Sequence, residues 1–317
     1  MLAMTLVGVC SRSFSRHPTL RAEILARYPQ TKFNDAGSSL SGDTLVAFLE
    51  DCDKAVIALE PISQDVLDRL PRLQVIAKYG VGFDKLDLDG MREKGIRLGW
   101  VPGVNRRAVS ELALCFMVTL LRRVAPLSRS VAAGDWSPGV GSQLSSKTVG
   151  IVGCGHVGKD IAGILRAMGV NVLAHDIIDQ RAYYEAAGIK PATLDHLLRT
   201  SDIVSLHLPL NASTKGIISS ELLTTMKPGA MLINTARGGL VDELALAEAL
   251  KSGQLSGAAF DVFADEPPGD HPLFALDNFL ATPHIGGSTE DSILAMGRAA
   301  IQGLDDNRLP EPGVFPL

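Results

Sequence analysis

Short apolar runs alternate with amphipathic segments along most of the chain, and this alternation predicts its elements. In the first hundred residues the runs that predict strands are Leu6–Cys10, Lys54–Leu59, Gln74–Lys78 and Arg97–Gly99. Segments with helical spacing lie between them, at about Thr19–Tyr28, Asp43–Glu50, Ser63–Leu70 and Leu86–Lys94. Strands that alternate with helices indicate βαβ units and a mostly parallel sheet. We therefore expect a small flavodoxin-like α/β domain in this part of the chain.

A second series begins at Thr148, after a long predicted helix (about Arg107–Arg123) and a polar, glycine-bearing stretch (Ala133–Gly141). Its six predicted strands are Val149–Val152, Asn171–His175, Ile203–His207, Met231–Asn234, Ala258–Val262 and Phe279–Ala281. Six strands separated mainly by helical segments match the doubly wound parallel sheet of a Rossmann fold. A last predicted helix, about Glu290–Leu304, lies past the final strand, and periodicity alone does not decide which domain it joins.

A glycine-rich turn opens the second series. The sequence Gly153-Cys-Gly155-His-Val-Gly158 follows a predicted strand and begins a predicted helix, about Val157–Met168, which Gly169 can cap with a positive φ. In such a turn the first glycine allows the tight bend, the second lets backbone approach a pyrophosphate, and the third lets helix and strand pack closely. The free N–H groups of the helix then face the phosphates. The alternative is a structural turn that binds nothing.

Asp176 ends the next predicted strand, at the distance from the turn where a dinucleotide fold places its ribose-binding acid. A carboxylate there accepts hydrogen bonds from the ribose hydroxyls and repels a 2′-phosphate, so the sequence favours NAD over NADP. Arg181 argues the other way, because a nearby arginine can accept that phosphate. Asp176 could also be a solvated acid at a strand end.

Arg237, Glu266 and His284 each follow a short apolar run that predicts a buried strand. Ligands of open α/β sheets bind at the carboxyl ends of the strands, so we expect these three side chains to lie together. The arginine can bind a carboxylate with two parallel hydrogen bonds, and the histidine can transfer a proton near neutral pH. The glutamate can hold the histidine's tautomer and favour its charged form. The alternative is three unrelated surface residues.

Composition narrows the class of protein. A length of 317 residues suggests two domains, and 46% hydrophobic with 21% charged residues is ordinary for a soluble globular protein. A net charge of −5 argues against a nucleic-acid partner. The apolar stretch Val109–Leu121 is too short to span a membrane, and the N-terminal apolar run lacks a basic leader, so we expect no membrane association and no signal peptide. Cys10, Cys115 and Cys154 lie in apolar runs and predict buried free thiols, which suits the cytoplasm. No metal-binding constellation is apparent.

Taken as an ordered set, the motifs resemble the D-isomer-specific 2-hydroxyacid dehydrogenase family. The residues that carry the resemblance are Gly153–Gly158, His207-Leu-Pro209, Asn234-Thr-Ala-Arg-Gly238, Asp261-Val-Phe-Ala-Asp-Glu-Pro267, Thr282-Pro-His-Ile-Gly-Gly-Ser-Thr289 and, in the first half, Lys78-Tyr-Gly-Val-Gly-Phe-Asp84 with the helix Asn105–Leu121. The resemblance implies an NAD-binding Rossmann domain over 104–289. It also implies a smaller, discontinuous, flavodoxin-like substrate domain over 1–103 and 290–317, and a homodimer joined through the cofactor domains.

The resemblance further implies roles for individual residues. Arg237 would bind the substrate carboxylate, His284 would be the acid and base, Glu266 its partner, and Asp261 would face the nicotinamide amide. The implied substrate loop is Lys78, Tyr79, Gly80, Val81 and Gly82. The implied cofactor-binding set is Gly153, Gly155, His156, Val157, Gly158, Asp176, His207, Pro209, Thr235, Ala236, Asp261 and Gly286. His156 is expected to face solvent, and His207 to be a packing or cofactor-wall residue rather than a catalyst.

The activity expected from the resemblance is hydride transfer between NAD and a small D-2-hydroxy acid. Candidate substrates are 3-phosphoglycerate, hydroxypyruvate, glyoxylate and bulkier keto acids. Lys78 and Arg12 favour 3-phosphoglycerate because they could bind a phosphate, although Lys78 could equally point to solvent and Arg12 could belong to a plain polar loop. The chain ends soon after the last predicted helix, so we expect no C-terminal regulatory domain. NAD-sensing corepressors that bind peptides and phosphite oxidation are the alternatives.

Overall fold

The computed structural model describes residues 5–311 and divides into two compact units. The first unit comprises the chain up to Asn105 together with the chain from Gly287 onward, and the second comprises Arg106–Gly286. The expected domain boundaries, 103/104 and 289/290, lie two or three residues from these divisions. Both units are built on parallel sheets covered by helices, which confirms the predicted α/β fold class.

The first unit contains a parallel sheet of five strands among its described residues, in the order β2-β1-β3-β4-β5. Its strands are β1 Val7–Val9, β2 Thr31–Phe33, β3 Lys54–Ile57, β4 Val75–Lys78 and β5 Arg97–Gly99. This is the strand order of the flavodoxin-like fold. The sequence analysis missed β2, because it is short, half-buried, and carries Lys32 at its centre, so no apolar run marks it.

Helices cover both faces of this sheet. One face packs against α2 (Pro18–Arg27) and α13 (Glu290–Gly303), in a core that includes Leu20, Ile24 and Ala300. The other packs against α3 (Gly42–Leu49), α4 (Gln64–Asp68) and α5 (Leu88–Glu93). The short helix α1, Arg12–Arg16, follows β1. Because α13 contacts β4 and β5, the last helix belongs to the first unit, which the periodicity left open.

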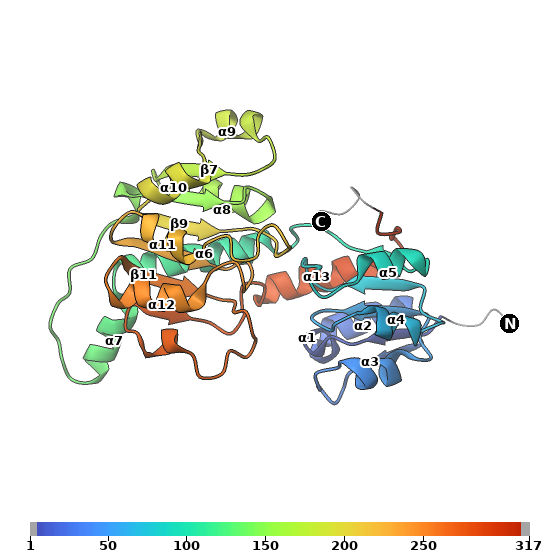
Figure 1. Ribbon diagram of the computed structural model, residues 1–317. Coiled ribbons are helices and arrows are strands. Elements are labelled where there is room, and N and C mark those ends of the chain that lie inside the picture. Colours follow the sequence, from blue (N-terminus) through green and yellow to red (C-terminus); the bar gives the residue numbers. More distant parts are fainter. Residues whose placement is uncertain (1–4, 312–317) are drawn as a thin grey trace. The chain divides into compact units, whose positions relative to one another are not determined.

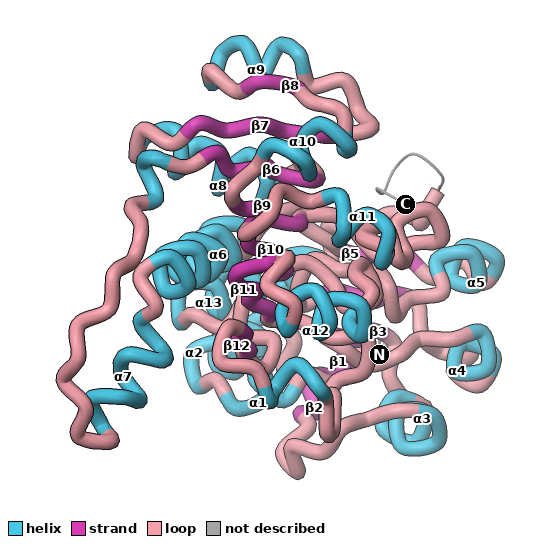
Figure 2. Tube along the Cα trace, turned by 60° about the vertical axis from the view of Figure 1, so that its left-hand side comes forward, coloured by secondary structure: helices cyan, strands magenta, loops and turns pink. Residues whose placement is uncertain are grey.

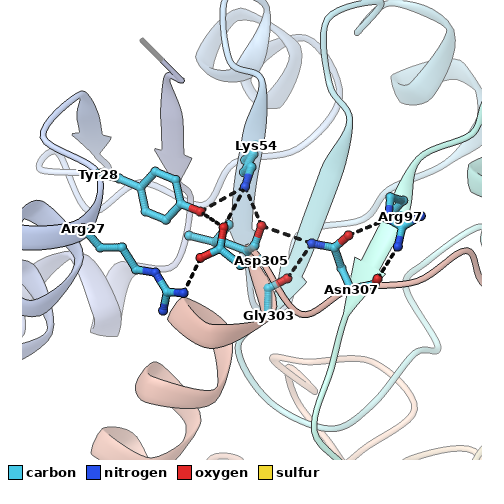
Figure 3. Close-up of polar contacts among 8 residues, drawn as sticks. Arg27, Tyr28, Lys54, Arg97, Gly303, Asp305 and Asn307 are labelled. Carbon is cyan, nitrogen blue, oxygen red and sulfur yellow. Dashed lines mark hydrogen bonds and ion pairs between the residues drawn. The ribbon is translucent and has the colours of Figure 1, made fainter.

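Polar contacts fasten the end of α13 to the sheet of the first unit (Figure 3). Lys54 Nζ donates to the Leu304 carbonyl at 2.6 Å and lies 3.2 Å from Asp305 Oδ1. Asp305 also accepts a hydrogen bond from the Tyr28 hydroxyl and pairs with Arg27 at 2.5 Å. These contacts satisfy a carbonyl that the helix end would otherwise leave without a partner.

The second unit contains a parallel sheet of seven strands among its described residues, in the order β12-β11-β10-β9-β6-β7-β8 (Figure 2). Its strands are β6 Thr148–Val152, β7 Asn171–His175, β8 Lys190–Pro191, β9 Ile203–Leu206, β10 Ala230–Asn234, β11 Leu255–Phe260 and β12 Phe279–Ala281. The order matches the doubly wound dinucleotide fold with one added edge strand. The prediction of six strands was wrong by one: β8 has two exposed residues, and its proline fits only an edge.

Two layers of helices enclose the second sheet. On one face α6 (Arg106–Leu121) and α8 (His156–Ala167) bury residues such as Phe116 and Ile161 against β6. On the other face α10 (Leu194–Thr200), α11 (Ser220–Thr225) and α12 (Glu243–Lys251) form a core with Leu197 and Leu246. Helix α9, Arg181–Ala187, lies beside β8 at the edge.

The segment between α6 and β6 departs from the compact part of the second unit. Helix α7, Val124–Ala132, has no buried residue, and the chain after it extends outward before it reaches β6 (Figure 1). Trp136 and Val140 in this extended part are 83% and 91% exposed. The sequence analysis described only a polar stretch here. No helix within residues 5–311 is long and apolar enough to cross a membrane.

Candidate active site

Glu266 and His284 form a hydrogen-bonded pair beyond the carboxyl ends of β11 and β12. The Glu266 Oε2 atom lies 2.8 Å from His284 Nδ1, and each side chain is about one-third exposed. A carboxylate only accepts hydrogen bonds, so Nδ1 carries the proton in this contact. Nε2 is then left for a ligand. The same glutamate accepts the Phe263 N–H with Oε1 at 3.1 Å, which fixes the carboxylate in its own loop.

Asp261 holds the backbone that carries His284. His284 has φ 54°, a left-handed conformation that is uncommon for a side-chain-bearing residue. The buried Asp261 carboxylate accepts hydrogen bonds from the N–H groups of Ile285 at 2.8 Å and Gly286 at 2.7 Å. It also accepts one from the Thr282 hydroxyl at 2.5 Å, and its own carbonyl accepts the His284 N–H at 2.9 Å. Burial raises the pKa of Asp261, and these hydrogen bonds oppose that rise.

The turn after β10 presents Arg237. The buried side chain of Asn234 accepts the Ala236 N–H at 3.1 Å and donates to the Arg237 carbonyl at 2.8 Å, so it shapes the turn from inside. A Cβ at Gly238 would lie 1.8 Å from the Phe263 carbonyl oxygen, so the Arg237 turn and the Glu266 loop touch through backbone. Arg237, Glu266 and His284 thus lie beyond the carboxyl ends of three neighbouring strands.

The glycine turn has the geometry of a phosphate cradle. Gly153 has φ 91°, and a Cβ at Gly158 would lie 2.1 Å from the Gly153 carbonyl, so the first and third glycines are required by the fold. A Cβ at Gly155, by contrast, would meet no described atom within 4 Å. Gly155 precedes the first residue of α8, where free N–H groups favour an anion. Packing within the described residues therefore does not require a glycine at this position.

Asp176 is already oriented by the glycine turn. One carboxylate oxygen accepts the Cys154 N–H at 2.7 Å and the other accepts the Ile178 N–H at 2.9 Å. Arg181, which argued for NADP, makes a bidentate pair with Asp179, from Nε to Oδ1 at 3.1 Å and from Nη2 to Oδ2 at 2.6 Å. Asp179 therefore competes with a 2′-phosphate for the Arg181 guanidinium, and this weakens the argument for NADP.

Two buried polar atoms near the strand ends have no hydrogen-bond partner within the described part of the chain: His207 Nδ1 and Thr235 Oγ1. His207 follows β9, which lies beside β6, the strand that leads into the glycine turn, and Thr235 follows β10, one strand further along the sheet. Burial lowers the pKa of His207 to about 4, so its ring is neutral. Unsatisfied neutral groups beside the cradle fit the amide and hydroxyl groups of a dinucleotide.

Other predicted residues are placed by the structure as follows. His156 is exposed, as expected. In the first unit Lys78 is buried and its ammonium donates to the Ala58 carbonyl, so the alternative that it points to solvent is wrong. In the adjoining loop Gly80 has φ 116° and the Val81 carbonyl accepts the Trp100 indole N–H at 3.2 Å. The substrate-binding role of Lys78–Gly82 stays a prediction.

One thiol differs from the expectation. Cys10 and Cys154 are buried, but Cys115 is exposed, because it lies on the outward side of the amphipathic helix α6. No group of three or more His, Cys, Asp or Glu residues within 5–311 is arranged to hold a metal ion. The sequence analysis quoted Asn234 only within a motif and did not single out Glu243. Asn234 ends β10 and Glu243 is the first residue of α12, and their contacts with the neighbouring loops appear only in the fold.

Comparisons with known proteins identify the family and the fold. Residues 114–286 match the family model described as D-isomer specific 2-hydroxyacid dehydrogenase, NAD binding domain. The chain is 35% identical over 267 residues to a D-3-phosphoglycerate dehydrogenase of Methanocaldococcus jannaschii, covering 83% of this chain and 51% of the relative. It is 36% identical over 264 residues to a hydroxypyruvate reductase of Thermotoga maritima, covering 81% of this chain and 85% of the relative.

A solved structure agrees with these matches. The crystal structure of D-lactate dehydrogenase from Aquifex aeolicus, complexed with NAD and lactic acid, superposes with a TM-score of 0.85 at 26% identity and covers 98% of this chain and 100% of that one. The chain spans about half the length of the phosphoglycerate dehydrogenases that it matches. The matched region covers 85% of the hydroxypyruvate reductase, so this relative is more similar to the chain in length, while its sequence identity is about the same as that of the phosphoglycerate dehydrogenases.

Proposed function

The chain belongs to the D-isomer-specific 2-hydroxyacid dehydrogenase family, and from this premise we propose that it interconverts a small D-2-hydroxy acid and its 2-keto acid with NAD. The observation that carries the proposal is the Glu266–His284 pair, whose 2.8 Å contact leaves His284 Nε2 available for a proton. Bound NAD supplies the hydride acceptor or donor.

His284 handles the proton in the proposed reaction. In reduction, the protonated ring gives its Nε2 proton to the keto oxygen; in oxidation, the neutral ring takes the hydroxyl proton. Glu266 keeps the other ring nitrogen protonated in both directions, so the ring presents the same atom to the substrate. Asp261 keeps the ring's backbone in its left-handed conformation through the Ile285 and Gly286 amides.

Arg237 is proposed to bind the substrate carboxylate. Its guanidinium can present two parallel donors to a carboxylate, a geometry that lysine cannot reproduce. Asn234 fixes the turn on which it stands. For the first unit, Lys78, Tyr79, Gly80, Val81 and Gly82 stay the proposed substrate-binding loop.

The leading substrate candidate is 3-phosphoglycerate, supported by the seven relatives that carry the name D-3-phosphoglycerate dehydrogenase. Hydroxypyruvate or glyoxylate is the second candidate, supported by the similarly long hydroxypyruvate reductase. An NAD-sensing corepressor-like binding protein is the alternative of a different class. An assay of NADH oxidation with the keto acid of 3-phosphoglycerate, hydroxypyruvate and glyoxylate, with NADPH as a parallel cofactor, separates the first two, and no turnover of any of them favours the third.

Two substitutions test the site itself. We expect His284→Ala and Arg237→Ala to lower kcat/KM about 10²- to 10⁴-fold, because each removes a group that acts on the substrate. NADH affinity, measured by fluorescence titration, should stay near that of the parent protein. Arg199→Ala, which removes an exposed arginine paired with Asp195 in the same unit, is the matched control. Full activity of either site variant would overturn the assignment.

We also propose that the protein is a cytoplasmic homodimer joined through the second unit. The apolar side chains Val131, Trp136 and Val140 on and after α7 are 49%, 83% and 91% exposed, which is unusual for large apolar groups unless a partner covers them. Trp136→Glu should shift the mass in analytical ultracentrifugation toward the monomer. An unchanged mass distribution would contradict this surface as the dimer contact.

A further inference from the structure

Glu243 and His271 form a mostly buried pair that the proposed reaction does not use. Glu243 is the first residue of α12, and His271 precedes the 3₁₀ helix η2, Pro272–Ala275. Their side chains are 12% and 14% exposed, and Glu243 Oε2 lies 3.2 Å from His271 Nε2. The imidazole also packs against Phe263 and Phe274, with ring centroids 6.1 Å and 5.7 Å apart.

The proton of this pair can be assigned from the contacts of His271. Its Nδ1 atom accepts the Leu273 N–H at 3.3 Å and caps η2. The proton of the neutral ring therefore lies on Nε2, which donates to Glu243 Oε2. Both ring nitrogens are thus used inside the protein. His271 is the titratable group that faces Glu243, and its role is to orient that carboxylate.

Glu243 reaches the loop that carries Glu266. Its second oxygen, Oε1, accepts the Ala264 N–H at 3.0 Å. The preceding amide, that of Phe263, donates to Glu266 Oε1 at 3.1 Å. Two consecutive amides are therefore bound by two different carboxylates. The Phe263 carbonyl also lies against the backbone of Gly238, so the same short segment contacts the turn that carries Arg237.

We propose that Glu243, oriented by His271, is a positioning residue for Glu266 and, through Glu266, for the tautomer of His284. The inference rests on the proposed roles of Glu266 and His284. Without Glu243 the Ala264 amide loses its acceptor and the Phe263–Glu266 turn is released. Glu266 then holds His284 Nδ1–H less firmly, and the ring more often carries its proton on Nε2. That tautomer cannot accept the hydroxyl proton of a hydroxy acid.

The experiment compares three variants with the parent protein. Glu243→Ala removes the acceptor for Ala264, whereas Glu243→Gln retains a carbonyl oxygen for it. Glu248→Ala is the matched control, because Glu248 lies on the same helix but is 74% exposed and paired with Lys251. The readouts are kcat and KM for oxidation of the hydroxy acid, the NADH dissociation constant, and the ¹⁵N NMR signals of His284 at alkaline pH, which report its tautomer without any substrate.

We expect Glu243→Ala to lower kcat about tenfold or more with little change in NADH affinity, since small misplacements of catalytic groups are costly. The His284 signals should move from a predominantly Nδ1–H ring toward a mixture of tautomers. Glu243→Gln should fall between Glu243→Ala and the parent protein, because its oxygen serves the Ala264 amide while its NH2 group meets the His271 Nε2–H donor, and Glu248→Ala should match the parent protein. Unchanged His284 signals and kcat in Glu243→Ala, with only thermal stability lowered, would overturn the proposal.

The experiment also covers two cases, an inactive parent protein and a Glu243→Ala variant that does not fold. If the parent protein reduces no 2-keto acid, the proposed function fails, and the His284 spectra alone decide the positioning role. If Glu243→Ala does not fold, His271→Phe takes its place: it preserves the packing against Phe263 and Phe274 but removes the donor to Glu243 Oε2. It should shift the His284 signals in the same direction by a smaller amount, and parent-like signals would count against the proposal.

Discussion

His207 should make the stability of the cofactor-free protein sensitive to acid. The ring follows β9, its Nε2 lies 3.0 Å from Ser205 Oγ, and its Nδ1 is buried without a partner among residues 5–311. Burial lowers the pKa of His207 from 6.5 to about 4, because the interior disfavours the charged ring. Between these two values the unfolded chain binds a proton that the native protein does not. Stability therefore falls as the pH drops through this window.

The size of the effect follows from the two pKa values. At 1.36 kcal/mol per pKa unit, the full shift corresponds to about 3 kcal/mol, of which about 2 kcal/mol is lost between pH 8 and pH 5. His207→Gln keeps a polar group for Ser205 and cannot take up the proton. The variant should therefore lose about 2 kcal/mol less than the parent protein over the same interval, whatever its stability at pH 8.

Urea unfolding at a series of pH values measures this difference directly. The quantity compared is the change in unfolding free energy between pH 8 and pH 5, so a constant packing cost of the substitution cancels. His196→Gln, which removes an exposed imidazole from the same unit, is the matched control for the loss of one histidine. Parallel pH dependences of His207→Gln and the parent protein would refute the argument that burial keeps His207 neutral.

Three further outcomes are expected. Gly155→Ala should weaken NADH binding with little loss of Tm, because its Cβ meets no described atom within 4 Å, whereas Gly158→Ala should lower Tm clearly, because its Cβ would lie 2.1 Å from the Gly153 carbonyl; equal Tm values would contradict this. Asp305→Ala should cost about 1 kcal/mol in urea unfolding, because it removes the acceptor for the Tyr28 hydroxyl and the half-exposed ion pair with Arg27. Asp261→Asn should lower kcat and stability together, because an amide cannot accept all three hydrogen bonds now directed at the carboxylate; parent-like kcat would argue against a positioning role.

The sequence predicted the buried strands well and the marginal elements poorly. Strands such as Ile203–Leu206 are buried throughout and mostly apolar because helices cover both faces of the sheet. β8 consists of an exposed Lys190–Pro191 pair at the edge, where no burial imposes a pattern. Helix α7 follows directly on Arg122-Arg123 and packs no residue into the core, so no buried face marks it as a separate element in the sequence.

For the proposed site, the sequence predicted the three side chains that the structure places beyond the strand ends, but it did not predict the residues that bind the backbone of their loops. Arg237, Glu266 and His284 stand out because charged residues directly after buried strands are informative by position alone. Glu243 did not, because an acid at the start of a helix is ordinary dipole chemistry. Its contact with Ala264 crosses 21 residues of chain and exists only once α12 lies beside the Glu266 loop. Long-range backbone contacts of this kind leave no local pattern.

The discontinuity of the first unit imposes an order on its assembly during synthesis. Strand β5 packs against α13 so closely that a Cβ at Gly99 would lie 2.1 Å from the Gly303 carbonyl. Lys54 on β3 donates a hydrogen bond to the carbonyl of Leu304, the residue that follows α13. The second unit, continuous from Arg106 to Gly286, emerges from the ribosome before α13 does. The first unit, although begun earlier, must keep the sheet face that α13 covers open until α13 emerges. A nascent-chain proteolysis series should therefore find the middle of the protein protected before its beginning.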